Sequence, residues 1–371
     1  MSDTTKIEWC DHSWSPWEGC TKVSPGCLNC YAEARDKRHL FGPESHWGKG
    51  APRRLTKDWR KPVKWNQTDF VCRDCGAWDH GPSGDCVCGQ YGATGKIRHT
   101  RVFPSVCDWL DAEVPVEWLA RFLQLIHDTP NLDWLLLTKR PENFEERTLA
   151  ACQLWSESIT ASTAPMVRWL MDWRRGFEAP RNVWVGTSVE DQTRANQRVP
   201  ALLKIPARVR FLSVEPLLGP VDLIWTGALG CDCPPAYRED GEIDIRCTGG
   251  CSFYANAVDK SKVIDWIIVG GESGRNARVC NVDWIRSIVT QCADAGAPCF
   301  VKQLGARPVT SNANLYDFPE SVELREPWDD LKGSNADGFA AARIALNHPK
   351  GGDPLEWPEQ LRVRQFPEVN L

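Results

Sequence analysis

The amino-acid sequence predicts an α/β protein whose core is a full or partial (β/α) barrel. Short apolar strands alternate with helix-length segments along most of the chain, which is typical of a parallel sheet with crossover helices. About seven strands can be counted, and this number favours a curved sheet over a flat one. Three cysteines lie between the first strand and the helix that follows it, where α/β folds place their sites.

The individual elements are assigned from apolar runs, helical spacing and caps. Residues 7–18 form a short strand, and residues 31–40 form the helix after the cysteines. In the helix at 116–127, apolar side chains recur at helical spacing. The helix at 282–295 has Asn281 as its N-cap and a glycine just past its end. The remaining strands are expected at 101–107, 133–138, 182–188, 209–214, 264–269 and 298–302.

Composition limits the class of protein. The chain has 371 residues, of which 42% are hydrophobic, so it can bury a large core. Its N-terminus is polar and it lacks a run of about 18 apolar residues, so we expect no signal peptide, no membrane segment and a cytoplasmic location. The formal net charge of −5 gives no general attraction to nucleic acid, so any polyanion site must be local. The 17 cysteines, several in C-x-x-C and C-x-C spacings, indicate metal binding in a reducing compartment.

The first cysteine group is Cys20, Cys27 and Cys30, spaced C-x6-C-x2-C. Glycine and proline between them allow the loop to bend so that three thiolates face one point. Four thiolates saturate a zinc ion or an ordinary iron–sulfur cluster, whereas three leave one iron of a four-iron cluster open to another ligand. Spacing alone also permits three unliganded buried thiols, or a zinc site completed by Cys10, His12 or His39.

Two further cysteine groups have the spacing of complete four-ligand zinc sites. Each lies in polar, glycine-rich sequence that interrupts the strand and helix pattern and is too short to fold by hydrophobic burial alone. We therefore expect Zn²⁺-binding insertions at 67–95 and 226–258 in a barrel core at 1–305, followed by an irregular C-terminal extension at 306–371. The expected zinc ligands are Cys72, Cys75, Cys86 and Cys88 in the first insertion and Cys231, Cys233, Cys247 and Cys251 in the second.

A basic segment at 52–66 is the best sequence for contacting a polyanion. Basic side chains can neutralise phosphates while a tryptophan stacks on a base, which is the pattern of single-strand binding. A solvated basic face has the same composition and is the alternative. The expected nucleic-acid contacts are Arg53, Arg54, Lys57, Trp59, Arg60, Lys61 and Lys64.

Polar or charged residues follow every candidate strand. Because the carboxyl ends of parallel strands meet at one mouth, these residues should converge with the cysteine loop. In Gly270-Gly271-Glu272, the glycines would let backbone amides approach a carboxylate, ribose or phosphate, and Glu272 would accept from a hydroxyl or an amine. The P-loop and G-x-G-x-x-G fingerprints are not matched. Strand-end charges can also simply cap helices or pair with one another.

Five motifs together resemble a phage-enriched family of three-cysteine proteins that are similar to radical-SAM enzymes. The resemblance spans most of the chain and skips the two cysteine-rich insertions. The motifs are GCTKVSPGCLNCYAE at 19–33, TKRPE at 138–142, VWVGTSVED at 183–191, FLSVEPLLG at 211–219 and VGGESG at 269–274. Two features depart from the usual superfamily pattern: the longer C-x6-C spacing, and a Gly-Gly-Glu that follows a late strand instead of the second.

The resemblance implies a [4Fe–4S] cluster on Cys20, Cys27 and Cys30, with its open iron chelated by S-adenosylmethionine. It also implies an electron donor to the cluster and a 5′-deoxyadenosyl radical that abstracts a hydrogen atom from an unactivated C–H bond. The barrel mouth would then surround the cofactor. The residues expected to contact it are Ser105, Asp108, Lys139, Glu190, Glu215, Gly270, Gly271 and Glu272.

Three function classes follow from these patterns. The leading hypothesis is a radical-SAM-like enzyme that modifies, rearranges or repairs a nucleobase or nucleotide in phage DNA metabolism, in the host cytoplasm if it is phage-encoded. The second is a barrel hydrolase in which two of Glu190, Glu215 and Glu272 act as acid and as nucleophile or base. The third is a non-enzymatic zinc protein that binds nucleic acid, in which all eleven clustered cysteines are structural.

Overall fold

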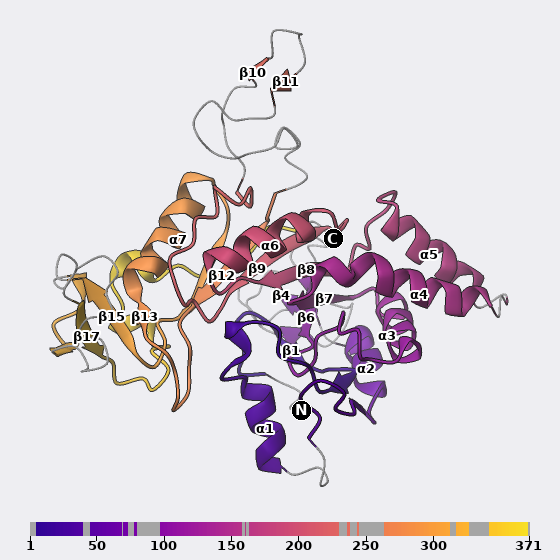
Figure 1. Cartoon of the computed structure of the whole chain (residues 1–371), viewed down its shortest axis with the longest axis horizontal. Coiled ribbons are helices and arrows are strands. Elements are labelled where there is room, and N and C mark those ends of the chain that lie inside the picture. The colour runs from indigo at the N-terminus through magenta and orange to yellow at the C-terminus, as the bar shows by residue number, and fades with distance from the viewer. Residues whose placement is uncertain are drawn as a thin grey trace.

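Figure 1 shows the computed structural model of the chain. The structure describes residues 5–39, 45–68, 70–72, 78–79, 97–157, 160, 163–229, 236–237, 243–244, 263–311, 317–325 and 341–369.

Seven parallel strands among the described residues form a sheet that curls into a half-barrel, which agrees with the expected partial barrel. Each strand pairs with the next one in chain order, so the parallel strands run across the sheet in sequence. The strands are β1 (His12–Ser13), β6 (Ile97–Phe103), β7 (Leu132–Thr138), β8 (Val183–Ser188), β9 (Val209–Val214), β12 (Trp266–Gly270) and β14 (Cys299–Gln303).

Six of the seven strand predictions are confirmed, one of them with a displacement. The first is wrong, because the residues expected as one strand at 7–18 contain two separate two-residue strands, β1 and β2 (Trp17–Glu18), and only β1 joins the main sheet. Strand β9 has the predicted bounds, and β7, β8, β12 and β14 differ from prediction by at most two residues at an end. Strand β6 begins and ends four residues earlier than expected. It stops at Phe103 because Pro104 has no N–H group for the ladder. Its polar N-terminal half, including Arg98, joins the sheet because Asp11 accepts two hydrogen bonds from that guanidinium.

Helices cover the outer face of the sheet. The sequence predicted α1, α3 and α7, and the Asn281 side chain caps α7 by accepting from the backbone N–H of Asp283, 3.0 Å away. In Figure 1, α1 projects away from the sheet, and α4 and α5 lie at the opposite end of the molecule from α7. The helices are α1 (Tyr31–His39), α2 (Arg60–Thr68), α3 (Val116–Asp128), α4 (Phe144–Ser156), α5 (Ala164–Arg174), α6 (Gln192–Leu203) and α7 (Val282–Asp294).

The two faces of the sheet bury separate apolar clusters. Along β7, Trp134 and Leu136 pack in the larger cluster with helices α3 to α7, whereas Leu135 belongs to the second cluster on the inner face. Trp266 lies in the second cluster and packs against Phe366, with ring centroids 5.2 Å apart. The inner face is therefore covered by the two ends of the chain, and this leaves its carboxyl-end rim for a site.

The region after residue 305 is more regular than expected. It contributes three strands, which join β13 (Cys280–Asn281) in a four-stranded sheet beside α7 (Figure 1). The chain then returns to the barrel, where the backbone N–H of Val301 in β14 donates to the carbonyl of Val363. The three strands are β15 (Pro308–Ser311), β16 (Glu323–Arg325) and β17 (Ala341–Ala345), and two 3₁₀ turns follow at Pro354–Glu356 and Glu359–Leu361.

Short hairpins mark the two expected insertions. Strands β4 (Phe70–Cys72) and β5 (Trp78–Asp79) pair with each other, and β4 extends the main sheet antiparallel to β6. Strands β10 (Ala236–Tyr237) and β11 (Ile243–Asp244) form the second hairpin. The side chain of Cys72 and all of Cys75, Cys86, Cys88, Cys231, Cys233, Cys247 and Cys251 lie outside the described residues, so both zinc assignments stay predictions.

Near the cysteine loop, β2 (Trp17–Glu18) pairs with β3 (Arg54–Leu55). Within the part of the chain that the structure describes, no helix has the length and apolar character to cross a bilayer.

Candidate functional site

A cavity of about 440 Å³ lies at the carboxyl ends of the parallel strands. Its wall includes all three cysteines of the N-terminal loop, Cys20, Cys27 and Cys30. The expected convergence of strand ends on this loop is therefore present. Six of the eight strand-end residues singled out from sequence also line it, namely Ser105, Asp108, Lys139, Glu215, Gly271 and Glu272, whereas Glu190 and Gly270 lie behind the lining.

Local backbone structure places each cysteine of the loop. Gly19 has φ +115°, and a Cβ there would lie 2.4 Å from the His46 carbonyl oxygen, so the turn into Cys20 requires glycine. Cys27 ends a 3₁₀ turn (Pro25–Cys27). Cys30 directly precedes α1, and its carbonyl accepts the backbone N–H of Ala34.

An arginine after β7 holds the first cysteine. Arg140 Nη1 lies 3.5 Å from Cys20 Sγ and 2.6 Å from Asp108 Oδ2, and its Nη2 donates to the Thr21 carbonyl at 2.6 Å. Asp108 also accepts from the Thr138 hydroxyl and from the backbone N–H of Lys139. Its carboxylate is thus committed to orienting Arg140 and the end of β7.

A carboxylate after β8 holds the middle of the loop. Glu190 is fully buried, and its Oε1 accepts the backbone N–H of Gly26 at 3.2 Å. Arg198 on α6 pairs with its other oxygen at 2.8 Å. Burial alone would raise the pKa of Glu190, but Arg198 and these hydrogen bonds lower it below its ordinary value. Glu190 is therefore an ionised anchor for the loop.

A carboxylate after β12 holds the end of the loop. Glu272 forms a bidentate pair with Arg278, with N–O distances of 2.9 and 2.6 Å, and accepts from Asn29 Nδ2 at 3.0 Å. Arg278 also donates to the Pro25 carbonyl at 2.9 Å. Burial would raise the pKa of Glu272, but the hydrogen bonds from Arg278 and Asn29 lower it. This acid, expected to accept from a ligand, is committed within the protein.

These three contacts, which we call the loop clamps, are Asp108–Arg140, Glu190–Arg198 and Glu272–Arg278. They support the three-cysteine loop from the ends of β7, β8 and β12. The alternative in which strand-end charges pair with one another describes Asp108–Arg140, whereas Glu190 and Glu272 pair with arginines of α6 and of the segment before β13.

Other strand ends direct polar groups into the cavity without contacting the loop. Lys139 Nζ donates to the Ser188 hydroxyl at the end of β8, 3.0 Å away. After β9, Glu215 Oε1 forms an ion pair with Lys302 Nζ at 3.1 Å, although the contact lacks hydrogen-bonding geometry and this buried oxygen has no other partner. Glu215 lines the cavity, but this oxygen itself has almost no accessible surface.

The paired glycines after β12 serve close backbone packing. A Cβ on Gly271 would lie 2.3 Å from the Leu304 carbonyl oxygen, and one on Gly270 would lie 3.0 Å from both Gln303 O and Glu215 Oε1. The close approach that glycine permits here is therefore to the end of β14, where a ligand's carboxylate, ribose or phosphate was expected.

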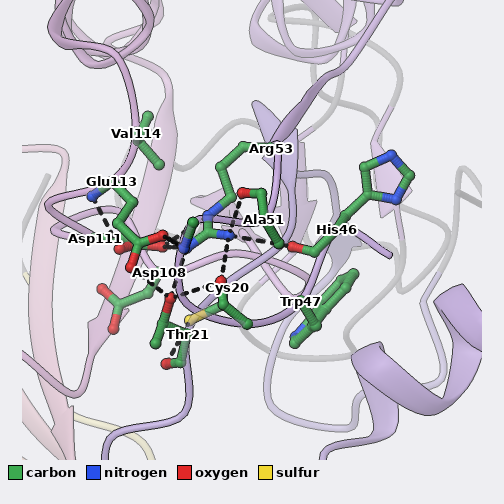
Figure 2. Close-up of polar contacts among 12 residues, drawn as sticks. Cys20, Thr21, His46, Trp47, Ala51, Arg53, Asp108, Asp111, Glu113 and Val114 are labelled. Carbon is green, nitrogen blue, oxygen red and sulfur yellow. Dashed lines mark hydrogen bonds and ion pairs between the residues drawn. The ribbon is translucent and has the colours of Figure 1, made fainter. Parts of the chain in front are cut away.

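Arg53, the first residue of the expected nucleic-acid set, is buried beneath the cysteine loop (Figure 2). Its Nε donates to Asp111 and its Nη2 donates to Thr21 Oγ1 and Glu113. Its Nη1 donates to three carbonyl oxygens, those of His46, Gly48 and Ala51. All five N–H donors of the guanidinium are engaged, which leaves none for a phosphate.

The rest of the basic segment is more accessible. Arg54 pairs with Glu18. Trp59 donates from Nε1 to the Thr56 carbonyl at 2.7 Å, and the Arg121 guanidinium lies 4.0 Å from its ring centroid. One ring face is therefore already covered. Lys57, Arg60 and Lys64 are exposed and Lys61 is half-buried, so this part of the nucleic-acid interface stays a prediction.

The three cysteines of the loop are half-buried. Burial and the nearby Asp108 carboxylate raise the pKa of Cys20 to about 12, against the opposing effect of Arg140. No group of three His, Cys, Asp or Glu side chains among the described residues is arranged to hold a single metal ion. Of the proposed fourth zinc ligands, Cys10 and His12 do not line the cavity, and His12 stacks on Trp65. The side chain of His39 lies outside the described residues.

Comparison with known proteins places the chain in one family. A family model described as "Protein of unknown function (DUF5131)" matches residues 4–340. The chain belongs to this family. No curated protein and no solved structure matches it.

Sequence reasoning missed several residues of this site. Cys107 lines the cavity, and its backbone forms a β-bridge with Gly19. Its position directly before Asp108 is the sequence feature that could have identified it. Lys350 reaches the cavity from the C-terminal region because Leu304 N donates to the Gly351 carbonyl at 2.8 Å. Nothing in the local sequence around Lys350 indicates this return.

Proposed function

We propose that this protein is a radical-SAM-type enzyme in which Cys20, Cys27 and Cys30 hold a [4Fe–4S] cluster. The observation that carries the proposal is that all three cysteines line one cavity at the mouth of a half-barrel. Three thiolates fit a cluster with one open iron, and the Arg140 N–H beside Cys20 Sγ suits a sulfur that bears negative charge. A nucleobase or nucleotide substrate and an electron donor remain part of this proposal.

The chain's own residues would bind and orient the reactants and would exclude water from the site. With S-adenosylmethionine, the cluster would supply radical chemistry on an unactivated C–H bond. The loop clamps hold the cysteine loop and contact the thiol of Cys20, and Glu215, which lines the cavity, would accept from an amino group of a bound molecule. Trp9, Phe103 and Leu137 form an apolar part of the wall, which keeps water from the reacting atoms.

The hydrolase alternative is less well supported by the site. It needs two carboxylates with separate acid and base roles. Glu190 and Glu272 are each paired with an arginine and hydrogen-bonded to the loop, which leaves Glu215 as the one member of the expected trio without such a pair. The zinc-protein alternative rests on eleven cysteines, and the side chains of eight of them lie outside the described residues.

Anaerobic reconstitution of the full chain with iron and sulfide tests the proposal. We expect about four irons per chain and a reduced EPR signal that changes when S-adenosylmethionine is added. Cys20→Ala, Cys27→Ala and Cys30→Ala should each lose the cluster. Cys152→Ala is the matched control, because Cys152 is a buried thiol of α4 outside the cavity. Iron content that is unchanged in the three loop variants, or bound zinc alone, would overturn the assignment.

A further inference from the structure

The cavity wall carries more cationic than anionic side chains. Its carboxylates are Asp108, Glu215 and Glu272. Its cations are five lysines, Lys6, Lys22, Lys139, Lys302 and Lys350. Asp108 and Glu272 are already neutralised by the arginines of the loop clamps, Arg140 and Arg278.

Pairing accounts for two of the five lysines. Lys22 Nζ lies 2.7 Å from Glu33, and Lys302 Nζ lies 3.1 Å from Glu215. Within the described residues, no carboxylate is in ion-pair contact with Lys6, Lys139 or Lys350. The wall therefore keeps an excess of positive charge after every ion pair in it is counted.

The proposed cofactors do not remove this excess. An oxidised four-iron cluster with three thiolates carries about one negative charge, and S-adenosylmethionine carries about one positive charge. Together they are close to neutral, so the half-buried Lys139 still lacks a counter-charge, whereas Lys6 and Lys350 are exposed to solvent. A further, anionic molecule would supply it.

Lys139 is the best placed of these lysines to bind an anion. Its side chain is half-buried, and its Nζ is fixed 3.0 Å from the Ser188 hydroxyl. Ser213 is paired with Ser188 in the β8–β9 register and also lines the cavity. An ammonium with neighbouring hydroxyls on rigid strand ends is a favourable setting for phosphate oxygens.

The same cavity has an apolar wall, in which the rings of Trp9 and Phe103 are tilted by 54° to each other. Trp9 and Phe103 both line it, with ring centroids 4.5 Å apart, and Leu137 lies in the same lining. A ligand with a planar apolar body and an anionic group would contact both the apolar wall and Lys139.

We propose that the cavity binds a nucleoside monophosphate as the substrate, with its phosphate on Lys139 and Ser188 and its base against the wall of Trp9, Phe103 and Leu137. A phosphate monoester carries about 1.5 to 2 negative charges at neutral pH, which matches the unpaired lysines. The proposal deepens the proposed function and rests on it for the reaction, but binding to Lys139 does not require the cluster.

Isothermal titration of the full chain without iron tests the site. The probes are the four 2′-deoxynucleoside 5′-monophosphates, the corresponding nucleosides, inorganic phosphate and a single-stranded oligonucleotide. We expect at least one monophosphate to bind at least tenfold more tightly than its nucleoside. Lys139→Met should weaken that binding at least tenfold and Ser188→Ala by a smaller factor. Lys204→Met, which removes an exposed lysine outside the cavity, should bind as wild type does.

The outcomes separate the substrate from the reaction. Absence of monophosphate binding, equal binding of nucleotide and nucleoside, or unchanged binding in Lys139→Met overturns the substrate proposal. Binding of the oligonucleotide alone also overturns it and assigns the site to a strand. If nucleotides fail to bind but the cluster assembles, the proposed function stands without this substrate. If nucleotides bind but the cluster does not assemble, the site stands and the proposed function fails.

Discussion

Two groups of charged residues occupy equivalent positions at the strand ends, yet they have different roles. The loop clamps after β7, β8 and β12 are buried, paired with arginine and bonded to the cysteine loop. Lys139 and Glu215 follow β7 and β9, Lys302 is the fourth residue of β14, and all three line the same mouth without contacting the loop. A strand-end charge thus becomes a support or a ligand group according to whether an arginine lies within reach. The first group should govern stability, and the second should govern binding.

Removing the most buried clamp should have the largest effect. In Glu190→Ala, Arg198 keeps its contact with the Ser188 carbonyl but loses its counter-charge, and Gly26 loses its acceptor. Breaking a buried ion pair on one side typically costs about 3–5 kcal/mol. We expect urea denaturation to show a loss of unfolding free energy in this range. Glu190→Gln keeps an acceptor for Gly26 and should lose less unfolding free energy. Equal stability of Glu190→Ala and wild type would show that this clamp does not stabilise the fold.

Acid should weaken two clamps together. The folded-state pKa values of Glu190 and Glu272 lie below the ordinary value of 4.5, so the unfolded chain binds protons more readily. Their stabilising contribution is therefore complete above about pH 4.5 and is lost as the pH falls through the folded-state values. Urea midpoints measured from pH 7 down to pH 3 should fall in this window. The double variant Glu190→Gln, Glu272→Gln should show a shallower decline, and a decline as steep as that of wild type would contradict this origin.

The Arg140 clamp differs from the other two because it also touches a thiol. Arg140→Lys keeps a cation beside Asp108 but loses the fork that reaches Cys20 Sγ and the Thr21 carbonyl. We expect a stability loss of about 1–2 kcal/mol from the lost hydrogen bonds. In the reconstituted protein, the potential of the cluster should shift to a more negative value, because hydrogen bonds to sulfur favour the reduced state. An unchanged potential, measured by EPR-monitored titration, would show that Arg140 supports the cysteine loop without tuning the cluster.

The strands and the cysteine loop could be predicted from sequence, but the division of the strand-end charges into two groups could not. The strand at 209–214 and the position of the cysteine loop follow from local apolar runs and spacing. The partner of a strand-end acid cannot be predicted from local runs and spacing. Glu272 contacts Asn29, which is 243 residues away in sequence, and Glu190 pairs with Arg198, which lies two turns into α6. The sequence pattern ranked Arg53 among exposed basic residues, whereas its burial depends on carboxylates 58 and 60 residues away, those of Asp111 and Glu113.

Crowding a clamp without removing charge should have a smaller effect. A Cβ on Gly26 would lie 3.0 Å from Glu190 Cδ, and the buried carboxylate cannot move away without leaving Arg198. Gly26→Ala should therefore cost about 1–2 kcal/mol. Gly219→Ala is the control, because a Cβ there meets nothing within 4 Å, and it should stay within about 0.5 kcal/mol of wild type. Equal unfolding free energies for the two variants would show that the loop is not tightly held at Gly26.

The smallest stability effect should come from the second group. Glu215→Gln removes the charge opposite Lys302, but that lysine side chain is 26% exposed and the pair lacks hydrogen-bonding geometry. Partly exposed pairs contribute about 0–1 kcal/mol, so urea denaturation should show little change. Binding should still respond, because a carboxylate that holds an amino group loses its charge and one acceptor in the amide. In the reconstituted enzyme, we expect weaker S-adenosylmethionine binding with unchanged iron content. If Glu215→Gln instead destabilises the fold as strongly as Glu190→Ala, the two groups of strand-end charges are not functionally distinct.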